Sequence, residues 1–156
     1  SAPAKTASAS PALSLPSHLK PLMFAFDKAV PYPNQEETIQ GWAEWIGRNL
    51  SNLRRQNQEI TFRGHASVPG TPDYNVKLAR NRANKAMMML AGELEKMATP
   101  EQKNQLYDMM ENLFRATSAG EDKPDFQKNW KNQRVDLVLV RKNLTRDNVN
   151  QANPKR

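Results

Sequence analysis

The strongest β-strand pattern in the chain runs from Arg134 to Val140, where five of seven residues are valine or leucine. These apolar residues occupy both odd and even positions, which predicts a strand buried on both faces. Such a strand needs neighbouring strands and covering layers, so the chain must build a sheet covered by other elements. The longest uninterrupted apolar stretch, residues 86–91, is far shorter than the roughly 18 residues that cross a bilayer.

Two shorter patterns supply candidate partner strands. The first covers Leu22 to Phe26 and is stopped by Asp27 and the prolines that follow. The second covers residues 59–63, with Ile60 and Phe62 on one face.

Three stretches have the apolar spacing of amphipathic helices. The first opens near Asn34, which we expect to cap the helix with Glu37 closing a capping box. The second covers about residues 74–97 and is expected to be capped by Asp73. The apolar stripes of these two are Ile39, Trp42, Ile46, Leu50 and Leu53, then Leu78, Ala79, Ala83, Ala86, Leu90 and Leu94.

A third helix is predicted over about residues 99–118. Thr99 is its expected cap, Pro100 occupies the first helical position and Gln102 closes the box. The order of elements, β-α-β-α-α-β, predicts an α/β (α+β) sandwich with a small mixed sheet covered by helices. We expect a Ser/Ala/Pro-rich linker over residues 1–18, one domain over 19–142 and a basic polar tail over 143–156.

Composition excludes several functional classes. The chain has no cysteine and two histidines without metal-ligand spacing, so we expect no disulfide, no metal site and no cofactor. The net charge of +7 favours anionic partners. Nucleic-acid binding rests on that charge alone, because no helix-turn-helix, RNP-like or zinc pattern accompanies it. The chain is not expected to be an enzyme.

One loop and the helix after it carry a recognisable pattern. Gly64-His65 is followed by Gly70, and then by Asn75, Leu78 and Arg82-Ala83. This spacing resembles the signature of OmpA-like domains. Further pieces follow the family's order: Phe24 to Asp27, Gly120-Glu121 with Pro124, and Asn132-Gln133-Arg134-Val135. The resemblance covers about residues 22–140, with the helix at about 99–118 as an insertion.

The resemblance implies a domain that binds the peptide stem of peptidoglycan non-covalently. A diaminopimelate side chain in that stem carries one ammonium and one carboxylate. Arg82 matches the family's arginine, whose guanidinium can grip a carboxylate through two parallel bonds. Asn75 is expected to hydrogen-bond the stem, and Leu78 to line the groove. His65 is expected to act as a loop residue that hydrogen-bonds backbone.

This chain departs from the family pattern at one position that matters for binding. Ala66-Ser67 stands where the family has threonine and aspartate, so Ser67 lacks the carboxylate that would meet the ligand ammonium. Asp27 or Asp73 is a candidate substitute. Arg134 remains from the family's arginine pair, and its neighbour has become Gln133.

Two functions therefore stay open. One is a periplasmic, outer-membrane-associated domain that anchors an envelope protein or complex to the peptidoglycan, with any lipid anchor outside this chain. The other is a degenerate OmpA-like structural subunit of an envelope-spanning secretion system of type IV type, with weak or no wall binding.

Overall fold

The computed structural model describes residues 11–119 and 131–142. Its strands form one four-stranded sheet in the order β1-β4-β2-β3. The sheet is mixed, because β2 pairs with β3 in parallel and β4 runs antiparallel to both of its neighbours. The strand bounds are β1 Leu22–Met23, β2 Gln58–Gly64, β3 Phe114–Ser118 and β4 Arg134–Arg141.

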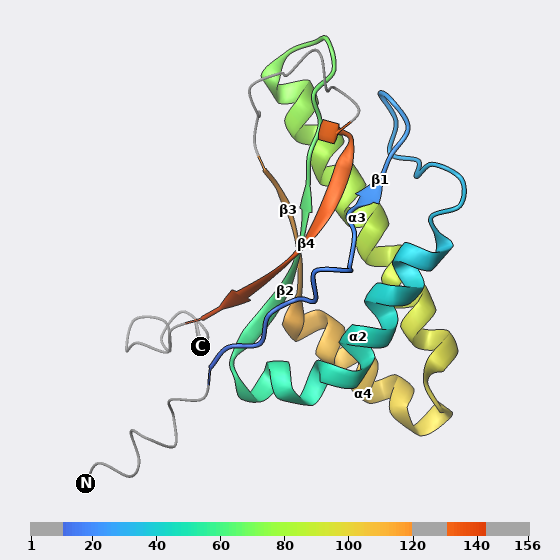
Figure 1. Cartoon of the computed structure of the whole chain (residues 1–156), viewed down its shortest axis with the longest axis vertical. Helices are drawn as coiled ribbons and strands as arrows, with labels where there is room; N and C mark the ends of the chain where they lie inside the picture. Colours follow the sequence, from blue (N-terminus) through green and yellow to red (C-terminus); the bar gives the residue numbers. More distant parts are fainter. Residues whose placement is uncertain (1–10, 120–130, 143–156) are drawn as a thin grey trace, which may run out of the picture.

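Three helices cover one face of this sheet (Figure 1). They are α2 Glu36–Arg55, α3 Pro72–Met97 and α4 Pro100–Leu113. The side chains that meet the helices come from paired positions on one sheet face, for example Ile60 beside Phe114 and Phe62 beside Leu137. The predicted α+β sandwich is therefore confirmed.

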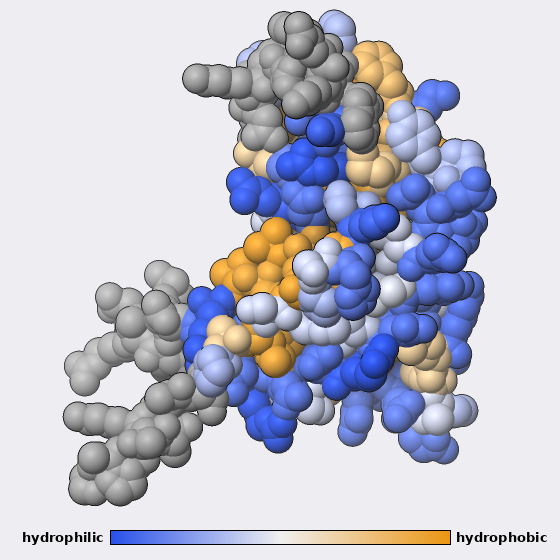
Figure 2. All heavy atoms as spheres, in the orientation of Figure 1, coloured by the Kyte–Doolittle hydropathy of each residue, from blue (hydrophilic) through white to orange (hydrophobic). Residues whose placement is uncertain are grey.

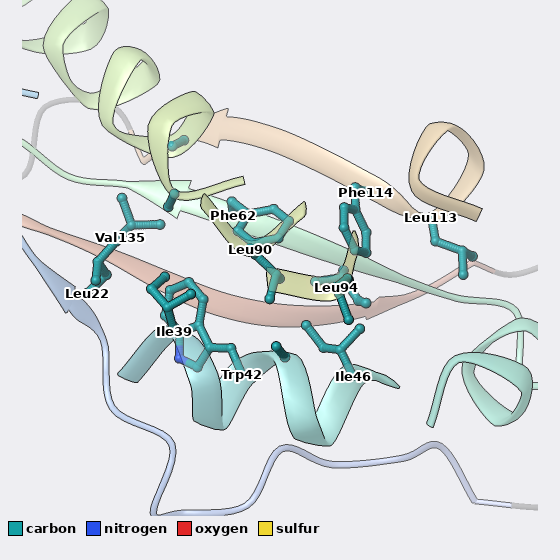
Figure 3. Close-up of a cluster of buried hydrophobic side chains, with 14 of the residues drawn as sticks. Leu22, Ile39, Trp42, Ile46, Phe62, Leu90, Leu94, Leu113, Phe114 and Val135 are labelled. Carbon is teal, nitrogen blue, oxygen red and sulfur yellow. The ribbon is translucent and has the colours of Figure 1, made fainter. Parts of the chain in front are cut away.

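The core lies between this sheet face and the helices (Figure 3). Phe62 meets Phe114 edge-on at 5.4 Å between ring centroids and lies 6.2 Å from Trp42. All the residues predicted for the stripe of α3 are buried, and so are those of α2 except Leu50, which is half-buried. Burying these apolar side chains is the main source of stability for the sandwich.

Two of the three predicted helix caps are wrong. Asn34 has φ 65° and lies outside α2, whose N-cap residue is Gln35 without a side-chain cap bond. The Gln35 side chain instead accepts a hydrogen bond from the backbone N–H of Met23, which is a tertiary contact. Thr71, and not Asp73, caps α3 by accepting from the Tyr74 N–H. The capping box of Thr99 and Gln102 is confirmed.

The third predicted helix is too long, and a strand follows it. α4 ends at Leu113, and Phe114–Ser118 forms β3 alongside β2. The apolar spacing through Phe114 fits a helix as well as a strand, so the pattern alone could not separate them. β4 is also not buried on both faces. Only Val135 is fully buried within it and Val140 is 43% exposed, because the described helices cover one face of the sheet.

The predicted linker and tail fall largely outside the described residues, as does the Gly120-Glu121 and Pro124 motif. Residues 11–21 are described and contain no helix or strand. They run along α2, where Trp42 donates from Nε1 to the Lys20 carbonyl at 2.9 Å. Within the described residues, no helix is long and apolar enough to cross a membrane.

Gly64→Ala should destabilise the domain strongly. An added Cβ would lie 1.8 Å from the Ala79 carbonyl oxygen, so β2 and α3 would have to move apart, at a cost of roughly 1–3 kcal/mol or more. Gly92→Ala, with open space around its Cβ in the same helix, should instead stabilise by about 0.5–1 kcal/mol. Urea unfolding measures both changes, and equal midpoints for Gly64→Ala and the native chain would contradict the close approach.

Candidate functional site

Arg82 lies at the centre of the region that the family motif identifies. It projects from α3, is fully buried and donates to three backbone carbonyls. Nε reaches Lys28 at 2.9 Å, Nη1 reaches His65 at 2.9 Å and Nη2 reaches Ala25 at 3.1 Å. The guanidinium therefore ties two separate loops to one helix, and these charge-assisted bonds offset the cost of burying it.

The electrostatics of Arg82 reflect this burial. Burial lowers the pKa of Arg82 to about 10, and the negative charge of Asp27 opposes the shift. The guanidinium still carries its charge at neutral pH. It also lies 5.8 Å from the centroid of the Phe24 ring, a cation–π distance.

The first of the two loops is a short hairpin over residues 24–31. An isolated bridge joins Phe24 to Pro31, and the Ala25 N–H donates to the Val30 carbonyl. Asp27 lies at its tip with φ 57°, and its exposed carboxylate accepts a hydrogen bond from the Tyr74 hydroxyl. The pKa of Tyr74 is raised mainly by this hydrogen bond and further by partial desolvation. The hairpin thus presents an exposed carboxylate beside the start of α3.

The second loop, residues 65–71, is held by side chains that the motif singled out. Asn75 accepts from the Val68 N–H at 3.0 Å and donates to the Val68 carbonyl at 3.1 Å. Gln133 donates to the Ser67 carbonyl at 2.9 Å. Leu78 packs beneath the loop in a small cluster with Ala66, Val68 and Ala79. Asn75, Ser67 and Leu78 are all buried, so in this structure they shape the loop.

Behind this loop, Asp136 and Arg134 of β4 form an ion pair, which the side chain of His65, the first residue of the loop, also contacts. His65 Nε2 lies 3.0 Å from an Asp136 carboxylate oxygen, and Arg134 Nε lies 3.1 Å from the same oxygen. Burial by itself raises the pKa of Asp136, but the hydrogen bond from His65 and the charge of Arg134 outweigh it, so the pKa lies below 3.8. Arg134 is committed to this pair and to the Lys131 carbonyl.

The structure therefore divides the predicted site residues into two sets. Asp27, Arg82, Asn75, Leu78, His65 and Ser67 meet around the two loops, while Arg134 lies behind them with Asp136. Tyr74 and Asp136 belong to this region and were not predicted. Tyr74 carried a signal, because it lies one residue before the motif asparagine. No group of histidines, aspartates and glutamates in the described part of the chain could hold a metal ion.

Comparison with solved structures identifies the fold. The peptidoglycan-associated lipoprotein of Burkholderia pseudomallei aligns over 78% of this chain and 90% of its own, with 21% identity and a TM-score of 0.55. The C-terminal domain of Helicobacter pylori MotB aligns over 86% and 98%, with 18% identity and a TM-score of 0.54. The OmpA-like domain of FopA1 from Francisella tularensis aligns over 78% and 71%, with 22% identity and a TM-score of 0.50.

The chain therefore has the OmpA-like fold, which confirms the resemblance read from the motifs. No sequence-family model matches the chain, and no curated protein matches it by sequence.

Arg82→Met should unfold the domain at much lower urea concentration than the native chain. It keeps the aliphatic bulk but leaves the carbonyls of Ala25, Lys28 and His65 without their donor, a loss of roughly 3 kcal/mol. Arg80→Met on the same helix removes an exposed arginine with one long 3.4 Å contact to the Ala116 carbonyl and should change stability by less than about 0.5 kcal/mol. Comparable losses in the two variants would show that Arg82 does not hold the loops.

Asp136→Asn should reduce the free energy of unfolding at pH 7 by roughly 1–3 kcal/mol. Because the pKa of this carboxyl is depressed in the folded state, its ionised form stabilises the fold above the unfolded pKa. That stabilisation is lost as pH falls through the depressed pKa, so the gap between variant and native chain should close in acid. Urea titrations from pH 7 to pH 2 test this, with the exposed Asp108→Asn as control. A gap that stays constant to pH 2 would refute the proposed ion pair.

Proposed function

We propose that this chain is a non-catalytic periplasmic domain that binds the peptide stem of peptidoglycan and holds an outer-membrane-associated protein or complex at the wall. The observation that supports it most is the exposed Asp27 carboxylate beside Tyr74, on a hairpin fixed by Arg82. The similar structures include a peptidoglycan-associated lipoprotein and MotB periplasmic domains. In this proposal residues 1–18 tether the 19–142 domain, and residues 143–156 extend towards a partner.

Asp27 takes the part of the carboxylate that Ser67 lacks. Ser67 is buried and its carbonyl already accepts from Gln133, whereas the Asp27 side chain is exposed. An ammonium from a diaminopimelate side chain would pair with Asp27 through a charge-assisted hydrogen bond. The Tyr74 hydroxyl orients the carboxylate and leaves oxygen lone pairs for this second donor.

Arg82 contributes to binding mainly by positioning the loops. Three of its five N–H groups are committed to carbonyls, and the side chain is fully buried. The predicted two-bond grip on a ligand carboxylate would need the two N–H groups that remain.

A structural role is the second candidate, and one observation favours it. The groups that would grip a stem peptide are buried or committed within the fold, as Arg82 and Asn75 show. A domain that kept these contacts only to stabilise its fold would look the same. It would then serve as a subunit of an envelope-spanning secretion system of type IV type and bind the wall weakly or not at all.

Co-sedimentation with purified sacculi separates these two candidates. Asp27→Asn should weaken pelleting roughly ten- to a hundredfold, since it removes one charge-assisted partner worth about 1.5–3 kcal/mol. The matched control Asp108→Asn makes the same charge change on α4 and should pellet like the native chain. A diaminopimelate-containing tripeptide should compete with the sacculi in salt that abolishes non-specific binding.

Two results would count against wall binding. Equal pelleting of Asp27→Asn and the native chain would remove Asp27 from the site, and pelleting that vanishes with salt in all variants would favour the structural subunit. The same supernatants test the non-catalytic assignment: labelled sacculi should release no fragments, and any release above the protein-free control would overturn it.

A further inference from the structure

Among the described residues, the outer edge of β4 is mostly unpaired. β1 covers only Arg134 and Val135, whereas β2 pairs with β4 along its whole length. Backbone groups of successive strand residues point to opposite sides. The Gln133 carbonyl accepts from Phe24 on the β1 side, and the Arg134 carbonyl accepts from His65 on the β2 side. The N–H and C=O groups of Leu137 and Leu139 therefore point outward at the free edge.

The chain that precedes β1 forms no strand with β4, although its Leu13 and Leu19 pack against the same core cluster as Leu137 and Leu139. Residues 11–21 lead up to β1 along α2 (Figure 1). Lys20 accepts from the Trp42 indole, and Leu19 packs where Gly41 has no side chain. At the far end, Leu13 exchanges two hydrogen bonds with the Gln58 side chain. In the described chain no hydrogen bond joins residues 11–21 to the backbone of Leu137 or Leu139.

An apolar surface accompanies the free edge. Leu137, Val138 and Leu139 are half-buried and Val140 is 43% exposed. Figure 2 shows this surface as an orange patch over the second half of β4, beside a blue, hydrophilic end. An edge with unpaired backbone groups and apolar side chains is a template for another strand.

Charge at this end of β4 decides between possible occupants. Arg141 and Lys142 follow the apolar run, where Arg141 donates to Gln56 and Lys142 pairs with Glu59. Arg54 and Arg55 on the adjoining end of α2 leave this end of the sheet with an excess of positive charge. Two copies paired antiparallel through Leu137 and Leu139 would place Arg141 of each beside Val135 of the other, where β1 already occupies the edge. The short edge that remains disfavours a second copy. A lipid surface is disfavoured too, because it cannot hydrogen-bond the outward N–H groups.

We propose that the β4 edge docks an extended, acidic segment of a partner protein, which adds a strand to the sheet beside Leu137 and Leu139. Main-chain hydrogen bonds give this mode its affinity, apolar side chains pack against Val140, and acidic side chains face Arg141. The site lies on β4 and is separate from the Asp27 hairpin, so it stands whether or not the domain binds peptidoglycan.

Hydrogen exchange of individual amides tests the proposal with a synthetic probe. The probe is an acidic heptapeptide in which valine alternates with aspartate, threonine or glutamate. In the free 156-residue chain, the Leu137 and Leu139 amides should exchange much faster than those of Asp136 and Val138. Saturating peptide should slow Leu137 and Leu139 at least tenfold, and a peptide N-methylated at alternate residues along the face towards β4 should not.

Two pairs of protein variants test the contributions of backbone hydrogen bonds and of charge separately. Leu139→Pro removes one outward N–H, and Leu139→Ala keeps it, so only the proline variant should lose peptide binding measured by fluorescence anisotropy. Arg141→Glu should weaken binding roughly three- to tenfold, and Arg48→Glu on the exposed side of α2 should not. Arg141→Glu keeps the test valid if Leu139→Pro fails to fold.

Three other outcomes would overturn the proposal. No change in the two amides at saturating peptide would show that the edge does not accept a strand. Slow exchange in the free chain that is released by deleting residues 1–10 or 143–156 would assign the edge to the chain's own terminus. Protection that rises with protein concentration, together with a dimer in sedimentation velocity, would assign it to a second copy.

Discussion

The attachment of Arg82 to three backbone carbonyls is the interaction on which the rest of the candidate site depends. One fully buried guanidinium holds Ala25 and Lys28 of the hairpin and His65 of the following loop against α3. A buried charge is stable only when its N–H groups are hydrogen-bonded. If either loop moved away from α3, the guanidinium would lose acceptors that it needs while buried. The two loops therefore behave as one unit, with the position of Asp27 set by a residue far away in sequence.

The contacts around this unit show which parts of the site are fixed and which can vary. Asn75 and Gln133 hold the second loop from within, and the lack of a side chain at Gly64 lets β2 approach α3. Ser67 lies inside this fixed layer, whereas Asp27 and Tyr74 lie on its exposed rim. The proposed use of the Asp27 carboxylate in place of a loop carboxylate therefore needs no change in the fold.

The sandwich leaves two surfaces available, and they lie on different elements. The hairpin and loop form one at the ends of β1 and β2, and the free edge of β4 forms the other. The second exists because β1 has only two residues and the preceding segment is held by α2. Under the two proposals, the hairpin surface would contact the wall while the β4 edge holds a protein partner.

Local sequence patterns by themselves determined the helices and the two longer strands. The stripe of α3, the Thr99–Gln102 box and the alternation of Ile60 and Phe62 are read from neighbours in the chain, and the motif placed Arg82, Asn75 and His65 in one region. Tertiary structure alone decided the rest. The Gln35 side chain accepts from the Met23 N–H and so does not cap its own helix. Residues 114–118 form β3 because they pair with β2. Arg82 is buried because two distant loops supply its acceptors. These features depend on groups that meet only in the folded chain, so no local sequence pattern predicts them.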